Sequence, residues 1–388
     1  MHRQVLPHPL HNRYTARKAF ADSIVNTSAD ELWKYGISRI AEITNFDVIG
    51  IPVWTGCRPL SKTVSLHAGK SLDSNLSKAG AIMESIEFEI SQTPVGDYLH
   101  TSYNDIPKGY ALDWRDCTLS RNSIINDNTI IPWEIVDNLN GGVMYVPSAM
   151  IWMSPREKEY FNHFQVSSNG VASGISVTDA TISALYEVIE RDAWTVDAFK
   201  CENGAKPRVI KYECDVLDKI RMAGLMPIIF DCTSDIGIPS FGATILEPGA
   251  SGSYAGHGCH RDPSIAIERA LLEAVQSRCV YIAGARDDLM RRNFITMKGI
   301  SQDGLKDMYN SLPSNDVHTE VVDTSDEIKY ILTKLQKKGF NKVFRKVLHE
   351  GTINGCNFAV VRVFVPGLEV PQFDSWYPSK RCYGRTGN

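Results

Sequence analysis

The stretch that most constrains this chain is an apolar helical segment, TISALYEVIERDAWTVDAF at residues 181–199, which carries charged residues in its middle. Its apolar side chains go nearly all the way round a 3.6-residue period, so the helix is expected to be buried. Glu187 and Glu190 lie one turn apart on one face of it. A buried carboxylate is costly unless it is paired or holds a cation, so both glutamates need a partner.

A second segment repeats this pattern much earlier in the chain. Residues 69–91 and 169–193 each contain a glycine-bearing loop, a polar helix start, an apolar helical run and then Glu-x-x-Glu. The pair in the first segment is Glu84 and Glu87. We therefore expect two packed helices that face each other with four carboxylates.

Such a group of carboxylates predicts a metal site. Like-charge repulsion would raise their pKa values and destabilise the fold, and a divalent cation removes that problem. Hard carboxylate oxygens suit magnesium, which usually binds together with substrate phosphates, so the implied ligand is a nucleotide. Taken alone, however, Glu-x-x-Glu is common on solvated helix faces. No GxxxxGK[ST] and no strand-linked GxGxxG occurs, so neither a P-loop nor a Rossmann site is supported.

Composition disfavours two classes of partner. The formal net charge of −4 gives no basic footprint for nucleic acid, and no segment approaches the roughly 18 apolar residues that span a bilayer. The N-terminal residues lack the apolar core of a secretory signal, so we expect a cytoplasmic protein. The nine cysteines are scattered singly, which predicts reduced thiols. His257, Cys259 and His260 lie close together in the sequence. We favour the interpretation that they are neighbours by chance over a metal or nucleophile site.

The coarse pattern predicts an α+β fold, because the strands are grouped and the helices are interspersed irregularly. Residues 28–43 read as a helix followed by a second helical turn, and Thr178 with Asp179 marks a helix start. Residues 100–140 and 300–325 read as surface excursions. The other predicted helices are 76–91, 179–200, 212–223, 263–284 and 325–338, and the predicted strands are 46–54, 62–68, 142–153, 226–232, 240–246, 252–258 and 357–365.

Several motifs in order resemble the YcaO family. They are the two glutamate segments, SNG before the second helix, GHGCHRDPSIAIERALLEAVQSR, and RVFVPGLE. The likeness runs from about Ile37 to Glu369, and it implies an N-terminal segment 1–36 followed by one YcaO-like domain, 37–388. The resemblance further implies a family-specific α+β fold with mixed or antiparallel sheets, ATP and Mg²⁺ as cofactors, and phosphorylation of a peptide-backbone amide oxygen.

Carried over position by position, the resemblance assigns roles to residues in all the motifs. Two departures are Gly80 and Phe88, where the family usually has serine and arginine. The family's N-terminal lysine and serine contacts to nucleotide cannot be matched securely, and Lys18, Ser23 and Ser28 are the candidates. The implied metal ligands are Glu84, Glu87, Glu187 and Glu190; the implied catalytic residues are Glu187, Glu190, Arg191 and Arg269; and the implied nucleotide contacts add Lys70, Asn169, Glu273 and Gln276.

The nucleophile that attacks the activated amide would decide the product. External sulfide gives a thioamide, a side-chain thiol or hydroxyl gives an azoline, and a backbone amine gives an amidine. The chain ends PSKRCYGRTGN and lacks the P-x-P-x-P tail of many cyclodehydratases, which favours the thioamide. The implied partners are a precursor peptide and a TfuA-like, E1-like or leader-binding protein, and a homodimer stays open. Two alternatives are a noncatalytic nucleotide-binding scaffold and an ATP-dependent carboxylate-amine ligase.

Overall fold

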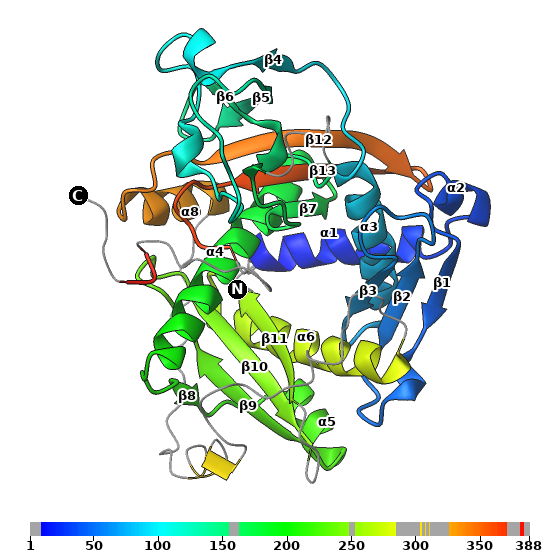
Figure 1. Ribbon diagram of the computed structural model, residues 1–388. Coiled ribbons are helices and arrows are strands. Elements are labelled where there is room, and N and C mark those ends of the chain that lie inside the picture. The colour runs from blue at the N-terminus through cyan, green and yellow to red at the C-terminus, as the bar shows by residue number, and fades with distance from the viewer. Residues whose placement is uncertain are drawn as a thin grey trace, which may run out of the picture.

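The computed structural model describes residues 9–154, 163–247, 253–284, 326–370 and 381–383, together with positions 303, 304, 307 and 310. These residues form three sheets with helices packed against them, as the predicted α+β class requires (Figure 1). None of the described helices combines the length and the apolar character needed to cross a bilayer.

The helices include four that shape the centre of the molecule. These are α1 (Pro9–Ile24), α3 (Ser74–Ser91), α4 (Val177–Glu202) and α6 (Pro263–Ala283). Shorter helices are α2 (Ala29–Trp33), α5 (Asp215–Met222) and α8 (Glu327–Gln336). The five predicted helices at 76–91, 179–200, 212–223, 263–284 and 325–338 thus form within a few residues of their predicted bounds.

All strand pairs within the three sheets are antiparallel. One sheet has the order β1-β2-β3 (Arg39–Glu42, Val53–Cys57, Leu66–Lys70). A second has the order β11-β10-β9-β8 (Ser253–Cys259, Ser240–Leu246, Met226–Asp231, Val209–Ile210). The third has the order β4-β5-β12-β13-β7 (Leu99–Thr101, Ile131–Asn138, Phe344–Ile353, Cys356–Phe364, Val171–Gly174), with β6 (Val143–Pro147) on β5.

Four predictions about local structure are wrong. The predicted strand 46–54 does not form from Phe46 to Pro52, since Thr44–Phe46 make a 3₁₀ turn and β2 begins only at Val53. Residues 39–42 form strand β1 and not a helical turn, because Gly36 takes a left-handed conformation (φ 71°) and the following residues pair with β2. Residues 100–140 are not only a surface excursion, since β5 enters the third sheet and Trp133 is fully buried. The N-cap of α4 is Ser176, whose hydroxyl accepts a hydrogen bond from the Asp179 N–H, and not Thr178. The predicted excursion at 300–325 lies almost wholly outside the described residues.

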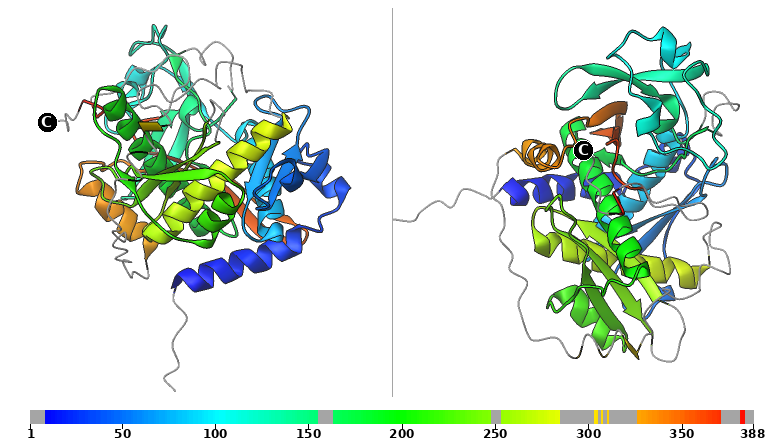
Figure 2. Two further views of the ribbon diagram at one scale, coloured as in Figure 1. Left: turned by 90° about the horizontal axis from the view of Figure 1, so that it is seen from below. Right: turned by 60° about the vertical axis from the view of Figure 1, so that its left-hand side comes forward.

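Helix α4 lies at the centre of the molecule. It packs against β7 and β13 of the third sheet and against β10 and β11 of the second, and Figure 2 (right) shows it descending from one sheet to the other. Leu185 and Ile189 are fully buried on it, in a cluster with residues of β13 and α8. Burial of this kind explains the all-round apolar pattern of the helix.

Three strand-to-helix units recur: β3 with α3, β7 with α4, and β11 with α6. The helices begin at side-chain N-caps, Asp73, Ser176 and Asp262. In every unit a strand glycine approaches the helix backbone very closely, and in the second a Cβ on Gly174 would lie 2.4 Å from the Ala180 nitrogen. A Cβ on Gly69 would lie 1.9 Å from the Ser77 carbonyl oxygen, and one on Gly258 would lie 2.1 Å from that of Ala266. Strand and helix can therefore pack backbone to backbone only because these residues are glycines.

We predict that Gly69→Ala lowers the free energy of unfolding by about 3 kcal/mol or more, because the added methyl group has no room against α3. Urea unfolding followed by circular dichroism measures the change. Gly80→Ala is the matched control on the facing helix, where the nearest atom to the new methyl would be the Gly69 Cα at 3.3 Å. That variant should stay within about 1 kcal/mol of wild type, since alanine also favours the helix. Equal effects of the two substitutions would contradict this account of the packing.

Candidate functional site

The structure shows that the glutamate pairs occupy equivalent places in the three units. Each pair begins eleven positions after the N-cap of its helix, from 73 to 84, from 176 to 187 and from 262 to 273. The third pair is Glu273-x-x-Gln276 on α6, so the repeat is threefold and not twofold. We call Glu84, Glu87, Glu187, Glu190 and Glu273 the carboxylate cluster.

The glutamates of α3 are tied to the strands of two different units. A carboxylate oxygen of Glu84 accepts a hydrogen bond from the Ala68 N–H in β3 (3.1 Å). One of Glu87 accepts from the Ser173 N–H in β7 (2.6 Å), so α3 is linked to the strand that precedes α4. Burial raises the pKa of Glu87 to about 8 although Ser173 opposes the shift, and the charges of Glu84 and Glu187 raise it further.

The two glutamates of α4 are held in a similar state. Burial raises the pKa of Glu187 to about 7, against the opposing charges of Arg191 and Arg362. Burial also raises the pKa of Glu190 to about 7, and the neighbouring charge of Glu273 adds to the shift. The Arg191 Nε lies 4.0 Å from a carboxylate oxygen of Glu190. Arg191 therefore lies next to the second glutamate pair, as its place in the sequence suggests.

The third unit contributes both charge and countercharge. Burial alone would raise the pKa of Glu273, but Lys70 and Arg191 outweigh it and bring the pKa below its usual value. The Lys70 Nζ lies 3.9 Å from a carboxylate oxygen of Glu273, so β3 and α6 meet here. Arg269 donates to the Cys259 carbonyl oxygen (3.3 Å), and its charge lowers the pKa values of both Glu190 and Glu273.

The donor set fits magnesium and a phosphate-bearing ligand. Across the described ranges no group of three or more His, Cys, Asp or Glu side chains can hold a metal by itself, so oxygens of a bound ligand would have to complete the coordination shell. The Asn169 Oδ1 and the Gln276 Oε1 are buried and lack a hydrogen-bond partner among the described residues. Buried polar atoms are rarely left unpaired without a reason, and a ligand would supply one. The metal-ligand assignments of the two Glu-x-x-Glu pairs stay predictions.

These pKa values predict how the metal-free protein responds to pH. Glu87, Glu187 and Glu190 have folded-state pKa values of about 8, 7 and 7, above their ordinary value of 4.5. The folded state therefore keeps protons that the unfolded state releases, and the free energy of unfolding should fall as the pH rises from about 5 to about 8. Thermal melting in EDTA across this range measures the effect. Glu87→Gln should flatten the profile, whereas a wild-type profile that is flat or rises would contradict the raised pKa values.

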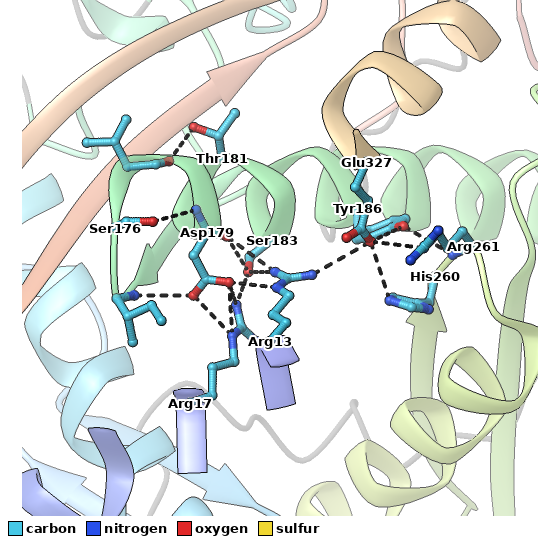
Figure 3. A network of polar contacts seen from close by, with 12 residues as sticks. Arg13, Arg17, Ser176, Asp179, Thr181, Ser183, Tyr186, His260, Arg261 and Glu327 are labelled. Carbon is cyan, nitrogen blue, oxygen red and sulfur yellow. Dashed lines mark hydrogen bonds and ion pairs between the residues drawn. The ribbon is translucent and has the colours of Figure 1, made fainter. Parts of the chain in front are cut away.

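Two arginines of α1, Arg13 and Arg17, contact the first turns of α4. Neither was among the residues predicted for the site. Arg13 and Arg17 of α1 both bond the Asp179 carboxylate, with a shortest distance of 2.6 Å from Arg13, and both donate to the Ser183 hydroxyl (Figure 3). Burial and the neighbouring Arg13 lower the pKa of Arg17 to about 10, and the charge of Arg269 lowers it further. Asp179 is thus shared by two arginines, and Arg13 also lies 3.7 Å from the Glu327 carboxylate.

Next to these arginines, a second network joins α4 and α8 to the short segment between β11 and α6. The Tyr186 hydroxyl donates to Glu327 (2.6 Å) and accepts from the Arg261 N–H (3.2 Å), as Figure 3 shows. Glu327 also lies 3.5 Å from the His260 Nε2 and 3.7 Å from Arg13. Because Tyr186 precedes Glu187, this network fixes the turn of α4 that carries the second pair.

The three N-terminal candidates lie elsewhere. Lys18 pairs with Asp22 (2.7 Å) and Asp73 (2.8 Å) on the surface. The Ser23 hydroxyl donates to a carbonyl oxygen of its own helix, and Ser28 is the N-cap of α2. None of these contacts involves the carboxylate cluster.

The two departures and one further residue have structural explanations. Phe88 stacks against the His67 ring with centroids 4.5 Å apart, so its position has become part of the packing between α3 and β3. Gly80 lies where α3 crosses Gly69. Arg362 of β13, which the sequence analysis missed, is buried and bonds the carbonyl oxygens of Met150 and Ser167 while its charge acts on Glu187.

Comparison with sequence families and relatives extends these observations. A family model described as YcaO cyclodehydratase, ATP- and Mg²⁺-binding, matches residues 68–369. An uncharacterized protein of Methanothermobacter thermautotrophicus is 32% identical over 366 residues, which cover 89% of this chain and 93% of that protein. A protein of Rhizobium leguminosarum bv. trifolii, named for its place in the tfuA 3′ region, is 30% identical over 359 residues, or 87% of this chain and 84% of that protein.

Solved structures share the fold at low identity. YcaO from Methanopyrus kandleri, solved with AMPPCP and Mg²⁺, has a TM-score of 0.66 at 18% identity, with 91% of each chain covered. A heterocyclase in complex with substrate and cofactor has a TM-score of 0.69 at 18% identity, and the match covers 89% of this chain but 52% of the heterocyclase. The Escherichia coli microcin synthetase McbBCD with pro-MccB17 bound has a TM-score of 0.63 at 16% identity, covering 84% and 87%.

Proposed function

The chain belongs to the YcaO family, which binds ATP and Mg²⁺, and on that premise we propose that it phosphorylates a backbone amide oxygen of a ribosomally made peptide. The observation that carries the proposal is the carboxylate cluster, which is drawn from three equivalent helices and bordered by Arg191 and Arg269. A site with this charge pattern suits phosphoryl transfer, which depends on positioning and on electrostatic stabilisation.

In the proposed mechanism, residues of this chain bind the ligands and stabilise the charge that develops during transfer. Bound Mg²⁺ would offset the negative charge of the carboxylates and of the phosphates. In the proposed reaction the peptide amide oxygen would attack the γ-phosphorus of ATP while the bond from that phosphorus to the bridging oxygen breaks and ADP leaves. A nucleophile would then add to the former carbonyl carbon, and the C–O bond would break to release the oxygen as inorganic phosphate. Arg191 and Arg269 lie where they can stabilise the charge that develops on the transferred group. Asn169 and Gln276 offer buried oxygens to the ligands of the site.

We further propose that Arg13 and Arg17 of α1 contact the nucleotide phosphates in place of the lysine and serine that the sequence could not match. Their place at the start of α4, two turns before Glu187, and the effect of the Arg269 charge on Arg17 support this role. Arg17→Gln should weaken AMPPCP binding about tenfold, because it removes a cation that is held in place at the start of α4 by its bonds to Asp179 and Ser183. Calorimetric titration with AMPPCP and Mg²⁺ measures the affinity. Lys18→Gln, one residue away on the surface, is the control and should leave it unchanged; equal affinities of the two variants would count against the role.

For the product, we favour a thioamide over an azoline or an amidine. The tfuA neighbourhood named for the Rhizobium relative supports that choice, and a TfuA-like sulfide-delivering partner goes with it. Intact mass of a precursor peptide co-expressed with the protein and its partner tests it. A thioamide is heavier than the starting peptide by the difference between sulfur and oxygen, whereas an azoline is lighter by one water. A peptide of unchanged mass would favour the noncatalytic scaffold, and a peptide joined to an amine would favour the ligase.

A further inference from the structure

One face of α4 carries three different kinds of side chain in order. Asp179 and Ser183 come first and bind the α1 arginines, Glu187 and Glu190 follow, and Trp194 lies one turn beyond Glu190. Residues four apart on a helix share a face, so Trp194 continues the line of the two glutamates. Its ring stacks on His257 of β11, with centroids 4.3 Å apart and planes at 37°.

Trp194 of α4 and His257 of β11 lie beside the carboxylate cluster, at the side where the second and third units come together. Burial lowers the pKa of His257 to about 4, and the charges of Glu273 and Arg191 also act on it, which places the imidazole close to both. The ring is therefore neutral at pH 7 and can accept a hydrogen bond on one nitrogen and donate one from the other. His257 and His260, which the sequence placed together, thus serve separate surroundings, since His260 stacks on Tyr186.

The polar atoms of the pair have hydrogen-bonding capacity to spare. Neither the indole N–H of Trp194 nor a ring nitrogen of His257 makes a hydrogen bond to another residue that the structure describes, and both side chains are half-buried. The opposite end of the same helix face is closed by α1, where Asp179 is nearly buried under Arg13 and Arg17. A nucleotide can be enclosed, but a peptide continues on both sides of its reacting amide and needs an open approach.

We propose that Trp194 and His257 form the subsite that receives the peptide next to the amide to be phosphorylated. The indole ring covers the chain and its N–H donates to a peptide carbonyl oxygen, while the imidazole accepts from a peptide N–H. The inference rests on the proposed function, because it takes the acceptor to be a peptide. Trp194 and His257 would then determine which peptide is accepted, and they would make no contribution to nucleotide binding.

The test uses the full-length protein and probes of known composition. Random dodecapeptides displayed on phage are selected on wild type in the presence of AMPPCP and Mg²⁺, and the selected peptides are made with a fluorescein label. Their affinities are then measured by anisotropy for Trp194→Ala, Trp194→Phe, His257→Ala and His257→Gln. Trp33→Ala, an exposed tryptophan on α2, is the control. AMPPCP affinity and melting temperature are measured for every variant.

We expect both alanine variants to weaken peptide binding about tenfold while AMPPCP affinity stays within about twofold. Trp194→Phe and His257→Gln should recover part of the loss, since they keep the ring or a hydrogen-bonding group. Loss of AMPPCP affinity in the alanine variants would instead assign the pair to the adenine base and overturn the proposal. Unchanged peptide affinity would overturn the subsite alone. A wild type that binds AMPPCP but selects no peptide would overturn the proposed function and the subsite with it.

Discussion

Glu190→Gln should lower peptide-dependent ATP turnover by about 10²–10³-fold, the largest effect that a single isosteric change in this site can have. The substitution keeps the size of the side chain and removes its charge at the point where α4 and α6 meet. Release of inorganic phosphate, measured with and without peptide, gives the result. Glu187→Gln should behave in the same way.

The same substitution should stabilise the metal-free protein at pH 8. Burial and the charge of Glu273 raise the pKa of Glu190 to about 7, so wild type must bear a buried negative charge at that pH. Loss of activity together with a higher melting temperature separates a functional carboxylate from a structural one. Glu202→Gln, at the exposed end of the same helix, is the control and should change neither quantity. Full activity of the Glu190 variant would remove the carboxylate cluster from the mechanism.

The two helices that carry the Glu-x-x-Glu pairs were predictable from the sequence because each is a long apolar helical run that a pair of glutamates interrupts. The third segment was assigned to the site through Glu273 and Gln276, but its equivalence to the other two segments was missed because its pair holds one carboxylate and not two. Counting from the N-cap would have revealed it, since Asp262 begins α6 as Asp73 begins α3. The spacing of eleven positions from the N-cap to the first glutamate therefore identifies all three units in the sequence.

Other features could not be predicted because they depend on contacts far apart in the chain. Arg13 and Arg17 are four residues apart, which is also the pattern of a solvated helix face, and only the docking of α1 on α4 reveals their partners. Strand β12 was missed because its sequence, FRKVLHEGTI, mixes charged and apolar residues, although the Asn354-Gly355 turn with positive φ that joins it to β13 is a strong hairpin signal.

A buried ion pair at the back of α4 leads to the second large effect. Asp192 is fully buried, and Arg381 bonds both of its carboxylate oxygens at 2.5 and 2.7 Å while also bonding Asp235. Arg381→Met should lower the free energy of unfolding by roughly 3–5 kcal/mol, because it leaves the buried charge of Asp192 without its cation. Denaturant unfolding at pH 7 measures the loss. Arg208→Met is the control. The half-exposed Arg208 side chain lies 3.8 Å from Asp197 of α4, and such an exposed pair contributes little to stability.

The double variant Asp192→Asn with Arg381→Met decides whether the charge itself causes the loss. Without the carboxylate there is no buried charge to neutralise, so much of the stability lost in Arg381→Met should return. Asp192 follows Arg191 directly but faces away from Glu187 and Glu190, on the opposite side of the helix. Recovery of ATP turnover together with stability would therefore mean that the pair supports α4 from behind. Recovery of stability without turnover would mean that Arg381 also holds Arg191 in its working position, and no recovery of either would exclude the buried charge as the cause.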